Sequence, residues 1–152
     1  MELRIGGTRS CTALLVVACQ LGSVIVAGIT VTNPGTMAAP GGHYSHAVTA
    51  NGFVFISGQL PIAPDGSRLA DAPFERQAEQ ALHNVEAALT AAGSALDRLV
   101  QVRVYVTDIK SWPAFNAIYA KWIGASRPAR AVVPVPELHY GFQIEVEAVA
   151  LA

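Results

Sequence analysis

Two charged residues near the end of the chain, Arg130 and Glu145, could carry chemistry. A guanidinium can hold a carboxylate through two parallel charge-assisted hydrogen bonds, and a carboxylate can orient or deprotonate a water molecule. In the alternative interpretation, Arg130 forms an ordinary salt bridge with Glu145 or Glu147, and both glutamates alternate outward on a solvated strand. The first interpretation predicts a site that binds an acid and activates water.

Four further positions carry groups that could line such a site. Ser57 and Gly58 end a short apolar run, where a backbone N–H could meet a ligand and a glycine permits close approach. Tyr44 offers a phenol and Asn116 offers an amide. Each has a structural alternative: a bulge or turn at 57–58, a half-buried aromatic ring, and a satisfied polar group on a helix.

Metal chemistry has little support in the sequence. Cys11 and Cys19 form no Cys-x-x-Cys pair and are too few for a disulfide framework. None of the four histidines stands in a His-x-x-x-His arrangement, and His43 and His46 come closest to one. We therefore expect no metal site.

The composition excludes several classes of protein. Of the 152 residues, 52% are hydrophobic and 14% are charged, and the net charge is −1. A chain with this much apolar surface folds rather than remaining disordered, and its length suits one domain. From Met37 onward, eight Lys and Arg face ten Asp and Glu. We therefore expect no nucleic-acid partner.

Hydrophobic periodicity predicts the elements that position these residues. Alternation with a period of two indicates strands, a period near 3.6 indicates helices, and Asn51-Gly52 indicates a tight hairpin turn. The predicted strands are Ser45–Asn51, Phe53–Ser57, Leu99–Thr107, Ala129–Pro136 and Phe142–Leu151, and the predicted helices are Asp71–Ala92 and one that begins near Ser111.

The same periodicity predicts which side chains are buried. The first helix has an apolar stripe of Phe74, Ala78, Ala81, Leu82, Val85 and Leu89. The predicted long strand buries Val100, Val102, Val104 and Val106. On the second helix, Trp112, Tyr119 and Trp122 are expected in the core rather than in a site.

The order of elements is β-β-α-β-α-β-β, which predicts a mainly antiparallel sheet with two helices on one face. Few residues are left to cover the other face of the sheet. A second copy of the chain is the natural candidate, so we expect an oligomer.

Residues 1–36 differ from the rest of the chain, and we place a boundary between them and a domain at 37–152. Arg4 and Arg9 precede an uncharged run from Ser10 to Thr36. Three interpretations are open: a start assigned too early, with Met37 as the true first residue; a signal or membrane-anchor segment; and a folded N-terminal element.

The stretch from Gly42 to Ala150 resembles the RidA (YjgF) family of enamine/imine deaminases. Six short motifs follow one another in the family's order and at about its spacing. They are Gly42-His43-Tyr44-Ser45-His46-Ala47, Val54-Phe55-Ile56-Ser57-Gly58-Gln59-Leu60-Pro61, Gln80-Ala81-Leu82-His83-Asn84, Asn116-Ala117-Ile118-Tyr119, Pro128-Ala129-Arg130 and Ile144-Glu145-Val146-Glu147-Ala148-Val149-Ala150.

The resemblance implies an α+β, chorismate-mutase-like fold and a homotrimer whose sheets form a closed barrel, with ligand clefts between subunits. It implies hydrolysis of reactive 2-imino acids such as 2-iminopropanoate, and of their enamine tautomers, to 2-oxo acids and ammonia, without a cofactor or metal. It also implies the roles of individual residues. Arg130 would fix the substrate carboxylate, and Glu145 would position the water. Tyr44 would be the third catalytic residue, with a phenol that donates to the substrate or closes over it, and Ser57, Gly58 and Asn116 would bind the substrate.

Several positions depart from the family's pattern. Val132 stands where the best-studied members have a cysteine, His43 replaces the usual proline, and His46 replaces the usual glutamine. The loop 124–127 is shorter than in the members closest to the family type. Because these changes surround the expected cleft, they bear on the preferred substrate more than on the reaction.

Two other functions compete with the deaminase. One is a non-catalytic regulatory trimer that binds 2-oxo acids in the same cleft, which the presence of Glu145 disfavours. The other is a ribonuclease, which the charge balance disfavours. We expect a cytoplasmic protein whose core domain has no membrane partner; export or anchoring is the alternative if residues 1–36 are genuine.

Overall fold

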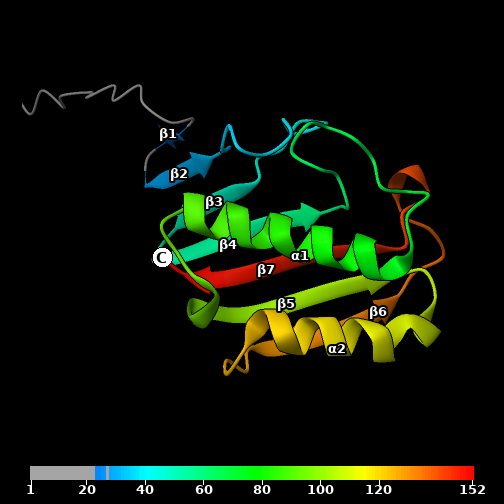
Figure 1. Ribbon diagram of the computed structural model, residues 1–152. Helices are drawn as coiled ribbons and strands as arrows, with labels where there is room; N and C mark the ends of the chain where they lie inside the picture. Colours follow the sequence, from blue (N-terminus) through cyan, green and yellow to red (C-terminus); the bar gives the residue numbers. More distant parts are fainter. Residues whose placement is uncertain (1–22, 27) are drawn as a thin grey trace, which may run out of the picture.

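The computed structural model describes residues 23–26 and 28–152, which form one sheet covered on one face by two helices (Figure 1). The sheet has seven strands in the order β1-β2-β3-β4-β7-β5-β6. Only β5 and β6 run parallel; every other neighbouring pair is antiparallel. The strands are β1 Ser23–Val26, β2 Ile29–Thr32, β3 Ala47–Ala50, β4 Phe53–Gln59, β5 Leu99–Val106, β6 Ala129–Pro134 and β7 Ile144–Leu151, and the helices are α1 Phe74–Ala91 and α2 Trp112–Ile123.

From β3 onward the order of elements is the predicted β-β-α-β-α-β-β, and the predicted α+β class is confirmed. The β3–β4 hairpin turns at Asn51 and Gly52, which have φ angles of 50° and 79°. Two successive positive φ angles are what a two-residue hairpin turn requires.

Helix α1 begins at Phe74, three residues after the predicted start at Asp71. The difference is due to Pro73, which precedes the first helical residue and pushes Ala72 toward an extended backbone. The predicted apolar stripe of the helix is buried along its whole length. Its side chains pack against β4 and β7, as Figure 1 shows for the helix as a whole.

Two predictions about buried side chains are wrong. Val100 is 42% exposed and Leu99 is buried in its place, because the register between β5 and β7 shifts between Leu99 and Gln101. Trp112 is also 42% exposed, since it is the first residue of α2 and lies before the turn that packs on the sheet. Tyr119 is buried, and Trp122 packs against the core.

The segment before Met37 contributes strands to the sheet. Strand β2 pairs with β3 along its whole length, and β1 pairs with β2. Thr32 and Met37 are buried, and the backbone N–H of His46 donates to the Asn33 side-chain oxygen at 2.8 Å. The sheet therefore begins before the predicted boundary at residue 37, and the three interpretations of residues 1–36 stay predictions. The interpretations that concern residues 1–22 lie outside the described residues.

The face of the sheet opposite the helices is uncovered in the single chain. Five of its apolar side chains are more than a third exposed: Ile29, Phe53, Phe55, Val133 and Leu151. This is the face that we expect a second copy to cover. Separately, neither helix in the described ranges is long and apolar enough to cross a membrane.

Candidate functional site

A pocket of about 530 Å³ lies where β4 and the start of β7 meet the loops at 37–46, 60–68 and 139–140. It brings together four of the predicted site residues: Tyr44, Ser57, Gly58 and Glu145. It does not include Arg130 or Asn116. One part of the predicted site is therefore assembled within a single chain.

Gly58 and Glu145 form the closest contact in this pocket. Gly58 lies in an irregularity of β4, between the last regular pair with β7 at Ile56 and the next pair at Gln59. A Cβ atom at residue 58 would lie 1.8 Å from Oε1 and 2.8 Å from Cδ of Glu145. The glycine is thus required by the carboxylate itself, which occupies the space where any other side chain would begin.

The environment of Glu145 makes its carboxylate more basic than an exposed one. Partial burial raises the pKa of its carboxyl above the ordinary value of 4.5, and the negative charge of Glu147 raises it further, whereas His139 acts in the opposite direction. A carboxylate with a raised pKa is a better proton acceptor than an exposed one. Glu145 is therefore suited to take a proton from water within the pocket.

Ser57 forms two hydrogen bonds to the neighbouring segment that precedes β3. Its backbone N–H donates to the His46 carbonyl oxygen at 3.0 Å, and its hydroxyl donates to the Ser45 carbonyl oxygen at 2.6 Å. The Ser57 backbone N–H is therefore used within the chain, and the ligand contact expected of the Ser57-Gly58 backbone stays a prediction. Ser57 lines the pocket and fixes the loop that precedes β3.

His46 anchors the same loop. Its Nε2 lies 2.8 Å from the Ala38 carbonyl oxygen, and because a carbonyl can only accept, Nε2 carries the proton. The ring is buried and meets the Tyr44 ring edge to face, with centroids 6.2 Å apart. This supports a positioning role for His46, which holds the segment that carries Tyr44.

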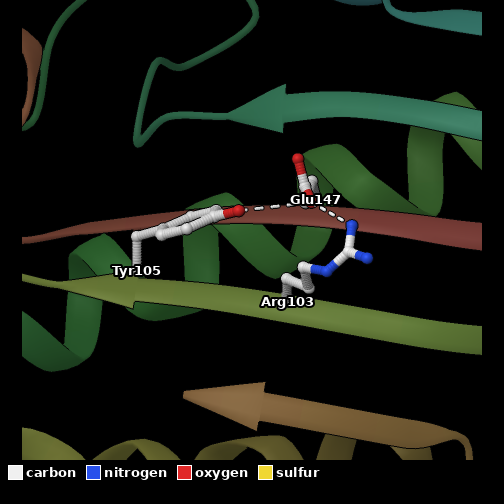
Figure 2. A network of polar contacts seen from close by, with 3 residues as sticks. All are labelled: Arg103, Tyr105 and Glu147. Atoms are coloured by element: carbon white, nitrogen blue, oxygen red, sulfur yellow. Dashed lines mark hydrogen bonds and ion pairs between the residues drawn. The ribbon is translucent and has the colours of Figure 1, made fainter. Parts of the chain in front are cut away.

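Glu147 is held on the open face of the sheet by two side chains from β5. Arg103 Nη1 donates to Glu147 Oε1 at 2.8 Å, and the Tyr105 hydroxyl donates to the same oxygen at 3.3 Å (Figure 2). Burial and the Glu147 carboxylate both raise the pKa of Tyr105. The Glu147 carboxylate therefore pairs with Arg103 and Tyr105 and not with Arg130.

Arg130 and Asn116 contact each other outside this pocket, where α2 packs beside the edge strand β6. Arg130 is on β6, and its Nη2 donates to Asn116 Oδ1 on α2 at 2.8 Å. Its guanidinium carbon also lies 4.5 Å from the centre of the Tyr119 ring. No carboxylate among the described residues forms an ion pair with Arg130. The salt-bridge alternative is therefore not observed, and most of the guanidinium donors are unused by the Asn116 contact.

Three residues of the pocket were missed by sequence reasoning. Arg68, His139 and Tyr140 line it, and the Arg68 guanidinium carbon lies 3.6 Å above the centre of the Tyr140 ring. The contact joins two loops far apart in the sequence, and neither loop carries a motif. In the part of the chain that the structure describes, no three His, Cys, Asp or Glu side chains are grouped as a metal site would need.

Residues 35–152 match the family described as Endoribonuclease L-PSP. The chain belongs to this family. Within it, the chain is 40% identical to protein HMF1 of Saccharomyces cerevisiae over 107 residues, which cover 70% of this chain and 82% of that one.

Solved structures of related proteins have the same fold as this chain. The Rid family protein YyfA of Yersinia pestis has a TM-score of 0.78 and 33% identity, covering 82% of this chain and 99% of its own. Escherichia coli TdcF, solved with bound serine, has a TM-score of 0.74 and 28% identity, covering 80% and 98%. The resemblance to Rid proteins seen in the sequence is confirmed.

Proposed function

We propose that this chain is a deaminase that hydrolyses reactive 2-imino acids and their enamine tautomers to 2-oxo acids and ammonia. The observation that carries the proposal is the Glu145 carboxylate, which lies in a pocket against Gly58 with its pKa raised. Hydration of a C=N bond needs a group that orients water and exchanges protons with it. Glu145 is the only carboxylate among the described residues that line this pocket.

The reaction needs no redox step. Water adds to the imine carbon, and Glu145 accepts a proton from the water as the new C–O bond forms. The imine nitrogen gains a proton, which gives a neutral aminoalcohol. The hydroxyl proton is then transferred to the amino nitrogen, and the C–N bond breaks as the C=O bond forms, which releases ammonia. The protein contributes position and charge, with neither cofactor nor metal in the proposal.

The substrate carboxylate requires a cation, and Arg130 is the candidate. Within one chain the Arg130 side chain lies against α2, on the helix-covered face of the sheet, whereas Glu145 lies outside that face in a pocket that does not include Arg130. A neighbouring copy can supply Arg130 to this pocket if copies assemble through the open sheet face into a homotrimer with clefts between subunits. The serine bound to the related TdcF supports a cleft that accepts small α-carboxylates.

The test is hydrolysis of 2-iminopropanoate, formed in place by an amino-acid oxidase. The wild-type protein should accelerate imine decay, and Arg130→Ala and Glu145→Gln should each lower the acceleration by at least about a hundredfold. If 2-oxo acids bind but imine decay is no faster with wild-type protein, the protein is a sensor and the deaminase proposal fails.

A further inference from the structure

The pocket contains a second arginine that the proposed reaction does not use. Arg68 lines the pocket together with Glu145, and it is the one Lys or Arg among the described lining residues. In the described ranges it forms no ion pair with a carboxylate. The Arg68 side chain stacks on the Tyr140 ring, whose centre lies 3.6 Å from the guanidinium carbon.

The loop that carries Arg68 is held in one conformation by hydrogen bonds. Residue 68 forms a strand-like bridge with Ile62, and the turn between them is closed by hydrogen bonds from Ala63 to Ser67 and from Gly66 to Ala63. The buried Asn84 side chain on α1 donates to the carbonyl oxygens of Leu60 and Ile62, both at 2.9 Å. Arg68 is therefore presented from a loop that is fixed to the core.

The ring below Arg68 is also held in place. Tyr140 has a φ of 61°, a left-handed conformation that is uncommon for a residue with a side chain. Its ring meets the buried Phe142 ring edge to face, with centroids 5.9 Å apart. A guanidinium stacked on a fixed aromatic ring keeps its N–H edge available for a bidentate partner, and the groups that it binds in this way are carboxylates and phosphates.

The size of the pocket leaves room for a longer acid. At roughly 30 Å³ for each water-sized group, the six non-hydrogen atoms of 2-iminopropanoate fill about a third of the 530 Å³. A substrate whose side chain carries a second carboxylate would use this space and meet Arg68.

From this geometry we infer that Arg68, stacked on Tyr140, is a specificity-determining residue that binds a side-chain carboxylate of the substrate. The substrate class is therefore the imines of acidic 2-amino acids, such as 2-iminosuccinate and 2-iminoglutarate. The inference rests on the proposed function, in which Arg130 of a neighbouring copy takes the α-carboxylate.

The test compares Arg68→Gln with Arg76→Gln, an exposed arginine on α1 that pairs with Glu79 and does not line the pocket. Arg68→Gln should lower kcat/KM for 2-iminoglutarate about tenfold, mainly through KM, and change kcat/KM for 2-iminopropanoate less than about twofold. Tyr140→Leu should act in the same direction, and Tyr140→Phe, which keeps the ring, should restore the preference. Arg76→Gln should behave like the wild type.

Binding of the products separates this inference from the proposed function. By calorimetry, 2-oxoglutarate should bind the wild-type protein about ten times more tightly than it binds Arg68→Gln, whereas pyruvate should bind both equally. If the wild-type protein hydrolyses no imine, the proposed function fails, and this binding difference still decides the role of Arg68. Equal losses for both ligands, or no loss for either, would overturn the inference.

Discussion

At the scale of single residues, the site depends on the contact between Gly58 and Glu145. Because Gly58 has no side chain, the Glu145 carboxylate can occupy the space beside it. The atom that a Cβ would strike first is the end of a flexible side chain, so Glu145 can move away when residue 58 is enlarged. This contact therefore bears on activity more than on folding.

Gly58→Ala should lower imine hydrolysis by at least about a hundredfold while costing less than about 1 kcal/mol of the free energy of unfolding. The carboxylate would be displaced without a loss of core packing. Gly35→Ala is the matched control, because a Cβ there meets no atom within 4 Å. Activity that survives in Gly58→Ala would show that the position of Glu145 does not matter.

Glu145→Gln should make the protein more stable at neutral pH, by about 0.5 kcal/mol for a partly exposed group. Because the pKa of Glu145 is raised in the folded state, ionisation of Glu145 opposes folding once the pH exceeds the folded pKa. Below the ordinary value of 4.5, both states are protonated and the advantage should vanish. Urea unfolding at several pH values measures this, and an advantage that is constant with pH would contradict it.

At the scale of elements, the segment that ends at Met37 is part of the sheet and of the pocket. Strand β2 covers the edge of β3, Asn33 accepts the His46 N–H, and Met37 and Ala38 line the pocket. The residues that line the pocket begin at Met37, but Asn33, which holds the lining residue His46, precedes the predicted domain boundary.

A protein that begins at Met37 should lose about 2–3 kcal/mol of the free energy of unfolding relative to one that begins at Gly28. The loss arises because β3 becomes an exposed edge and the His46 backbone loses its partner. Thermal and urea unfolding of the two proteins measure it. Equal stability would mean that β2 does not contribute to the fold.

The elements also show what a sequence can predict. The β3–β4 hairpin and the buried stripe of α1 follow from residues that are neighbours in the chain, so local patterns were sufficient. Val100 was placed wrongly because a bulge depends on the partner strand, which the alternation within β5 does not reveal. The contact between Arg68 and Tyr140 joins two loops without any motif, so only the folded chain shows it.

At the scale of the whole molecule, two features favour an assembly of several copies of the chain. They are the uncovered face of the sheet and the separation of Arg130 from the pocket that holds Glu145. The exposed apolar side chains on this face are expected to be covered by another copy, and the proposed site takes Arg130 from a second chain. That the assembly is a trimer is an expectation from the family resemblance; the residues alone predict only an oligomer.

Phe55→Glu should convert the assembly into monomers and lower imine hydrolysis at least about a hundredfold, although Phe55 does not line the 530 Å³ pocket. Ile109→Glu is the control, because Ile109 is similarly exposed, at 49% against 47% for Phe55, but lies outside the sheet. Sedimentation and activity should change together. A Phe55→Glu monomer with full activity would show that one chain holds the whole site.

The most direct test mixes two inactive variants. When Arg130→Ala and Glu145→Gln chains are unfolded together and refolded in equal amounts, a shared cleft can combine an intact Glu145 from one chain with an intact Arg130 from its neighbour. Random assembly should restore about a quarter of the wild-type clefts and hence about a quarter of the wild-type activity. Mixed oligomers, verified by mass spectrometry, that stay as inactive as either variant alone would contradict a site built between copies.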